Sequence, residues 1–329
     1  ISKKVDVVVH KYKSNKDLYL KLRYSTFLPL IFHGDLSMNN KTDAGLPHIF
    51  YEDNKVLFIN LTTILWLGST AINTLTGLSL QNGLALLALL SLAYSLTGGL
   101  KAVAMTDIVQ VILLIFGGLA VSFIALNKIS EGQGVLEGMS IVYTSMPEKF
   151  DMILSADNPS YKNLPGIWIL LGAGVWIGHF SYWGFSQYIT QRALGAKSIK
   201  EAQKGVMFAA YLKLLMPIVI VLPGICAAIL FPVLEKSDQA YPSMMSLLPN
   251  GLLGLTFAAL IAAIVSSLAS MTNSISTIFT MDIYRSFARQ DPSQARLISI
   301  GRASVVVSLL VAVFVAKPLL GSVSSIFQF

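Results

Sequence analysis

The sequence predicts an all-α integral membrane protein with about seven transmembrane helices. Of its 329 residues, 54% are hydrophobic and only 12% are charged, and the apolar residues stand in long runs. Soluble proteins carry about 25% charged residues, and a helix that crosses a bilayer needs about 20 apolar residues. The runs are continuous rather than alternating, which favours helices over barrel strands. The predicted spans cover 56–78, 82–100, 103–127, 165–189, 206–232, 251–281 and 303–320.

Residues 1–54 differ from the rest because they are polar and basic and contain no run of spanning length. We therefore expect an N-terminal extension over 1–54 and a transmembrane core over 55–329. Lysine and arginine are in excess in the connections 191–205 and 282–302, whereas acidic residues outnumber them in the connections before the fourth span and after the fifth. Because cytoplasmic loops carry the excess of basic residues, the connections 191–205 and 282–302 and the N-terminal extension are predicted to be cytoplasmic.

Composition and motifs exclude several classes of function. The net charge of +7 comes from basic residues in the connections and the extension rather than from one basic face, so nucleic-acid binding is not expected. The single cysteine, Cys226, excludes an intrachain disulfide and a cysteine-based zinc site. An intramembrane hydrolase built on His179, a serine and Asp107 is disfavoured, because the sequence has neither GxSxG nor HExxH. An enzyme is therefore not expected.

Ionisable groups inside a bilayer are costly, so each one is a candidate functional residue. Lys213 lies in the fifth predicted span, four residues before Pro217, and this proline is expected to kink the helix at the lysine. Lys213 either lines a cavity or extends towards the lipid headgroups. Asp107, in the third span, either attracts a cation on the cytoplasmic side or pairs with Lys101 as a solvated residue at a helix start.

The fourth predicted span is rich in glycine and carries His179, Tyr182 and Trp183 close together. Glycines permit a broken helix, and broken helices hold the substrate sites of many transporters. Aromatic rings beside hydrogen-bonding groups suit a polyhydroxylated ligand. The alternative is an aromatic belt at the membrane interface.

The sixth predicted span repeats serine at helical spacing. Ser266, Ser270 and Ser274 recur every four residues and so share one helix face, with Ser267 beside it. Adjacent hydroxyls, together with a free carbonyl of a neighbouring broken helix, can replace the water shell of sodium. The alternative is that small residues here only allow close helix packing.

Four stretches resemble the sodium/solute symporter family, and within it most closely the sodium/galactose and sodium/glucose transporters. They are YSLTGGLKAVAMTDIVQ (94–110), HFSYWGFSQYITQR (179–192), GAKSIKEAQKG (195–205) and the serine-rich run that ends in TMDIY (262–284). The resemblance covers about 56–329 and implies a partial LeuT-like inverted-repeat core, with core helices three to nine and the start of the tenth. The family's first two core helices have no counterpart in 1–54.

The resemblance implies sodium-coupled symport of a galactose-like or glucose-like sugar across the inner (plasma) membrane, with sodium as the coupling ion and no other cofactor. The expected partners are the sugar, sodium and the lipid bilayer. Matched to the family's motifs, the substrate-binding residues are His179, Tyr182, Trp183 and Lys213. His179 stands where the sodium/galactose transporter has an asparagine. The expected sodium ligands are Ala263, Ser266 and Ser267, with Asp107 near the inner ion exit and Ser270 where some relatives have a second ion site.

Two alternatives accompany this expectation. The first is a sodium symporter of the same family for a non-sugar solute such as a polyol, a carboxylate or an amino acid, since His179 and Lys213 would suit a carboxylate. The second is an inactive truncated fragment, because only part of each family site is expected in this chain.

Overall fold

The structure is a computed structural model that describes residues 46–151, 157, 173–288 and 292–321. The chain divides into two units, Ile1–Leu46 and Pro47–Phe329. The described residues contain helices and no strand. Four helical segments are long and apolar enough to cross a membrane, and Leu80–Leu96 is a shorter apolar one. The four are Met105–Ile129, Ile199–Leu230, Asn250–Phe287 and Gln294–Leu320.

The first helix, α2 (Leu46–Thr76), contains the predicted span 56–78 and packs against the start of α3 (Leu80–Ile129). Gly77 ends α2 with a positive φ of 74°, which favours glycine at this position. The Ser69 hydroxyl donates to the Leu80 carbonyl at 2.6 Å. A Cβ on Gly83 would lie 2.6 Å from the Ser69 hydroxyl oxygen. The two helices are therefore in close contact beside their turn.

The predicted spans 82–100 and 103–127 correspond to two apolar stretches, Leu80–Leu96 and Met105–Ile129. No loop separates them, because α3 is helical over 50 residues. Tyr94 and Thr106 nevertheless contact each other through their hydroxyls, although they are twelve residues apart. A straight helix would separate them by about 18 Å along its axis, so α3 must bend sharply between them. The helix changes direction here without a connection, which explains why the apolar run appeared divided.

Part of the predicted span 165–189 lies outside the described residues. From Ala173 the chain forms α6 (Ala173–Phe180) and a π-helical turn, η4 (Ser181–Phe185). Ser186 then adopts an extended conformation with φ −69° and ψ 119°, and α7 (Gln187–Leu194) follows. The helix is therefore broken at Ser186, as the glycine-rich sequence of this span permitted.

The fifth predicted span begins earlier than expected. α8 (Ile199–Lys213) starts directly after Ser198, whose hydroxyl accepts from the Glu201 amide at 3.3 Å. The regular helix ends at Lys213, and the chain continues through the π-helical η5 (Pro217–Val221) into α9 (Leu222–Leu230). Because Pro217 has no backbone donor, the α-helical hydrogen-bond pattern cannot continue unchanged through it. The irregularity lies at the predicted place.

The remaining helices are α4 (Val135–Ser145), η2 (Pro147–Lys149), η6 (Ser237–Gln239), α10 (Ala240–Met245), α11 (Asn250–Ile278), η7 (Phe279–Tyr284), α12 (Arg285–Phe287) and α13 (Gln294–Leu320). The connection between α12 and α13 is therefore shorter than the predicted 282–302. α13 begins at Gln294, nine residues before the expected start at 303, with Ser293 as its cap. Arg296 and Arg302 therefore belong to the helix. Charged residues at helix ends thus appeared as loop residues in the sequence.

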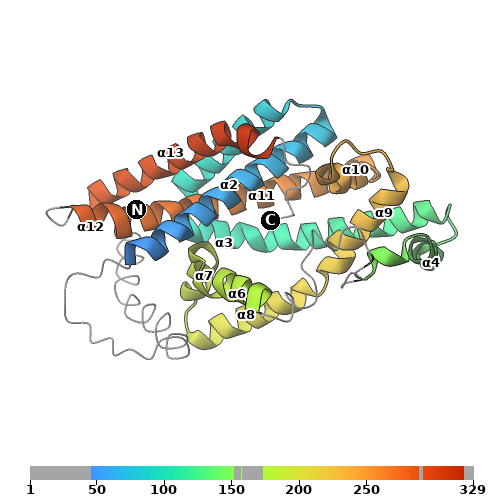
Figure 1. The fold of residues 1–329 in the computed structure, drawn as a ribbon, viewed down its shortest axis with the longest axis horizontal. Helices are drawn as coiled ribbons and strands as arrows, with labels where there is room; N and C mark the ends of the chain where they lie inside the picture. The colour runs from blue at the N-terminus through green and yellow to red at the C-terminus, as the bar shows by residue number, and fades with distance from the viewer. Residues whose placement is uncertain (1–45, 152–156, 158–172, 289–291, 322–329) are drawn as a thin grey trace. The chain divides into compact units, whose positions relative to one another are not determined.

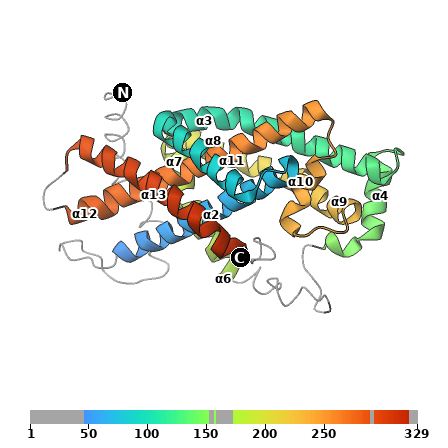
Figure 2. The same cartoon turned by 90° about the horizontal axis from the view of Figure 1, so that it is seen from above.

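α11 is the central helix of the described core. We call Leu80–Leu96 and Met105–Ile129, on either side of the bend, the first and second limbs of α3. One apolar cluster joins α11 to α2, α13 and the first limb, and a second joins it to α4, α9, α10 and the second limb. Phe257 packs against both clusters. Figure 1 shows α11 beside α2 and α13, and Figure 2 shows the same helices from above.

Candidate functional site

Three helices meet at a polar cluster on α11. The buried Ser266 hydroxyl donates to Oδ1 of Asp107 on α3. Nη2 of Arg192, on α7, lies 2.8 Å from Asp107 Oδ2 and 2.9 Å from the Ser270 hydroxyl oxygen. We call Asp107, Arg192, Ser266 and Ser270 the ion cluster. It contains a carboxylate and two hydroxyls, which are oxygen donors that a hard cation accepts.

The structure places the other predicted sodium ligands on the same helix. Ala263 and Ser267 are half-buried in the regular part of α11. The Ser267 hydroxyl has no hydrogen-bond partner among the described residues, so it is available to an ion. The Ala263 carbonyl belongs to a continuous helix, where it retains a second lone pair for an ion.

One alternative placed Asp107 at a helix start, but the structure does not. It lies inside α3, and its side chain is 25% exposed. Its contacts are to Arg192 and Ser266, whereas the Lys101 side chain lies outside the described residues. The carboxylate is therefore held by neighbouring helices.

A second cluster contains three of the predicted substrate residues. Tyr182 and Trp183 lie on η4 with their ring centroids 5.3 Å apart and their planes at 82°. Nζ of Lys213 lies 4.2 Å from the centroid of the Trp183 ring, which is a cation–π distance. The two rings are 40% and 42% exposed, so they remain accessible to a solute. We call Tyr182, Trp183 and Lys213 the aromatic cluster.

His179 is the predicted substrate residue that no described contact joins to the aromatic cluster. It lies near the end of α6, exposed, one turn before Tyr182 and Trp183. Its role stays a prediction.

α7 carries contacts that the sequence did not predict. The Tyr188 hydroxyl contacts that of Tyr182, and their ring centroids lie 6.0 Å apart. Gln191 Nε2 lies 3.5 Å from the Ser270 carbonyl, and Arg192 belongs to the ion cluster. The available signal was an arginine and a glutamine within one turn of a tyrosine, directly after an apolar span, but Arg192 was counted as a loop charge.

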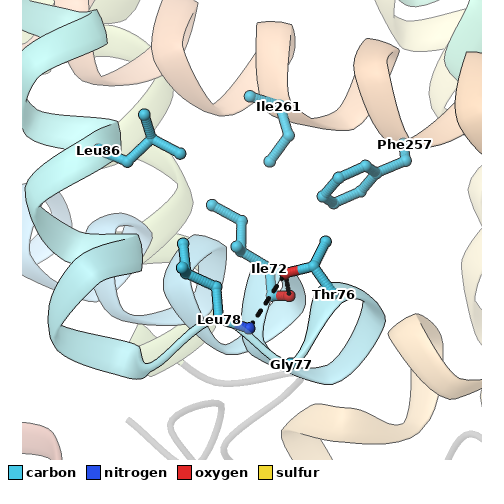
Figure 3. Close-up of a pocket in the computed structure, with 7 residues that line it drawn as sticks. All are labelled: Ile72, Thr76, Gly77, Leu78, Leu86, Phe257 and Ile261. Atoms are coloured by element: carbon cyan, nitrogen blue, oxygen red, sulfur yellow. Dashed lines mark hydrogen bonds between the residues drawn. The ribbon is translucent and has the colours of Figure 1, made fainter.

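One pocket of about 550 Å³ lies apart from both clusters, at the turn between α2 and α3. Figure 3 shows its lining, which comes from α2, α3, the turn and α11: Ile72, Thr76, Gly77, Leu78, Leu86, Phe257 and Ile261. The Thr76 hydroxyl is already bonded to the Ile72 carbonyl and the Leu78 amide. An apolar wall whose polar atoms are engaged does not suit a polyhydroxylated solute, so this pocket is not our candidate site.

Comparison with protein families finds a match over residues 55–328 to the model of the "Sodium:solute symporter family". The chain is 44% identical over 290 residues to a "Sodium/glucose cotransporter" of Vibrio parahaemolyticus, covering 83% of this chain and 53% of that protein. It is 31% identical over 284 residues to the human "Sodium/myo-inositol cotransporter 2", covering 78% and 42%. The chain thus spans about half the length of the curated relatives it matches.

A solved structure of a Na⁺-coupled sialic acid symporter, in a substrate-bound outward-open state, has the same fold. The TM-score is 0.68 at 22% sequence identity, and the match covers 83% of this chain and 58% of the other. The expected partial LeuT-like, all-helical membrane fold is confirmed by this likeness. At this level of identity the likeness concerns the fold alone.

Proposed function

Since the chain belongs to the sodium:solute symporter family, we propose that it serves sodium-coupled symport of a sugar-like solute and is not an enzyme. The observation that carries this proposal is that the ion cluster and the aromatic cluster lie close together. α7 contacts both of them, through Arg192 and Tyr188, which are one helical turn apart. One cluster offers oxygens to a cation, and the other offers exposed rings and an ammonium group to a solute.

In this proposal, sodium binds between the Ser266 and Ser267 hydroxyls and the Ala263 carbonyl, and the Asp107 carboxylate lies on its path to the inner side. Ser270, beside Arg192, is the candidate for a second ion. A membrane potential of 100 mV contributes about 2.3 kcal/mol for each charge moved, which corresponds to about 50-fold accumulation for each sodium. No covalent bond is made or broken.

The solute is proposed to lie against Tyr182 and Trp183, with Lys213 and His179 at its polar edge. A sugar fits because its ring faces are apolar and its edges carry hydroxyls. A carboxylate-bearing solute is the second candidate, favoured by the exposed ammonium group of Lys213 beside the rings. Relatives named for glucose, myo-inositol and sialic acid are compatible with either choice.

We place the protein in the inner (plasma) membrane, with residues 1–54 as a cytoplasmic extension of the 55–329 core. The excess of basic residues in the connections that we assign to the cytoplasm supports this orientation.

Uptake by proteoliposomes tests the function. Labelled galactose, glucose, myo-inositol and proline are offered separately, with either sodium or potassium outside. We expect uptake of one or more of the first three that sodium stimulates and potassium does not. If sodium stimulated neither uptake nor binding of any of the four solutes, the proposal would be wrong.

A further inference from the structure

α7 touches both clusters within one helical turn. At its start, the Tyr188 hydroxyl contacts the Tyr182 hydroxyl of the aromatic cluster, with the two rings at 77°. Four residues later, Arg192 contacts Ser270 and Asp107 of the ion cluster. The helix has eight residues, so it is about 12 Å long. A displacement at one end of so short a helix moves the other end.

The Tyr182–Tyr188 contact also bridges the break at Ser186. The extended residue interrupts the helical hydrogen bonds between η4 and α7, so Ser186 alone would leave the two halves free to turn relative to each other. Tyr188 additionally packs against the apolar cluster that α2, α3, α11 and α13 form. The ring is thus fixed on the core side, and its hydroxyl holds Tyr182.

We propose, on the basis of the proposed function, that α7 is the strut that couples the two clusters and that Tyr188 is a positioning residue. Sodium at the ion cluster changes the partners of Asp107 and Ser270, which shifts Arg192 and with it α7. The Tyr188 hydroxyl passes this shift to Tyr182, and so sets the solute affinity. By linkage, the solute must change sodium affinity by the same factor.

The test measures the ratio of the solute dissociation constant in potassium to that in sodium, using whichever of labelled galactose or myo-inositol the parent protein binds. Tyr188→Phe keeps the ring and removes only the hydroxyl. We expect the ratio to fall about two- to tenfold, the worth of one hydrogen bond, while affinity in potassium stays within about twofold. Tyr143→Phe, on α4, should leave the ratio unchanged, because no hydrogen bond of that hydroxyl is found among the described residues.

A double-mutant cycle separates the strut from a merely structural role. Tyr182→Phe removes the other hydroxyl of the same pair, so the double variant should lower the ratio no further than Tyr188→Phe alone; Tyr182→Phe also serves if Tyr188→Phe does not fold. If the Tyr188→Phe protein kept the full ratio, the coupling role of α7 would be wrong, whereas the proposed function would stand. A parent protein that binds galactose, glucose, myo-inositol and proline no more tightly in sodium than in potassium overturns the proposed function itself.

Discussion

Arg192 and Asp107, 85 residues apart in the sequence, meet between α7 and α3 with Arg192 Nη2 2.8 Å from Asp107 Oδ2. The side chains are 40% and 25% exposed, so solvent screens the pair and its contribution to stability is small. In the proposed ion site the pair would matter through competition instead, since the guanidinium holds a carboxylate oxygen that a sodium ion could use.

Replacing Arg192 should therefore tighten sodium binding. Arg192→Gln removes the competing charge, which for a screened pair is worth about 1 kcal/mol. We expect the sodium concentration for half-maximal uptake to fall about fivefold. Lys204→Gln is the control, because its ion pair with Glu201 at 3.1 Å lies exposed on α8. Weaker sodium binding in Arg192→Gln would show that the arginine orients the site rather than competes for it.

The hydroxyl of Ser267 should be required for sodium dependence. Ser267→Ala removes a half-buried hydroxyl without a described partner, so folding should be unaffected while sodium loses a ligand. Sodium-stimulated uptake is expected to disappear, with normal membrane insertion by fractionation. Ser304→Ala should keep full uptake, because among the described residues this hydroxyl bonds only to the carbonyl of Gly301 on its own helix. Unchanged sodium dependence in Ser267→Ala would remove this residue from the ion site.

Lys213 should distinguish the two candidate classes of solute. Lys213→Met removes the ammonium group but keeps an unbranched side chain against Trp183. For a neutral sugar we expect the KM to rise about two- to tenfold, and for a carboxylate about 10- to 150-fold, since bonds to charged groups are stronger. Lys200→Met, at the exposed start of α8, is the control. A KM that does not change for any transported solute would exclude Lys213 from the solute site.

Close packing of the second limb of α3 should depend on Gly118. A Cβ there would lie 2.3 Å from Val219 Cγ1 and 3.1 Å from the Val219 carbonyl oxygen. Gly118→Ala is expected to destabilise the protein by about 1–3 kcal/mol and to lower the midpoint of thermal unfolding in detergent. Gly254→Ala, where a Cβ meets nothing within 4 Å, should unfold at the parent temperature or above. Equal midpoints for the two variants would contradict the packing.

The helical segments could be predicted from the sequence because apolar length and the cost of unpaired backbone groups in lipid leave few alternatives. The four-residue spacing of Ser266, Ser270 and Ser274 predicted one shared face, and all three are buried. The ends of α8 and α13 were misplaced because charged residues extend helices beyond the apolar run. Hydropathy could not find the bend in α3, since a bent helix and two short helices have the same composition.

The composition of the candidate site could be predicted better than its connections. Lys213, Tyr182 and Trp183 stood out because polar and aromatic groups are unusual in a span, and the structure brings them together. Arg192 and Tyr188 were missed because their partners depend on how α7 turns after Ser186. Spacing along one helix determines which residues share its face, but the partners across a break depend on tertiary packing.

The extended residue in the middle of the α6–α7 segment has a consequence for hydration. The Ser186 side chain caps none of the amides that begin α7, and peptide groups without partners are not tolerated against hydrocarbon. If this segment lies within the bilayer, as the proposed transport site requires, water must reach these amides, directly after the turn that carries Tyr182 and Trp183. A solute that arrived through this water would exchange its own hydration shell for contacts with the two aromatic rings.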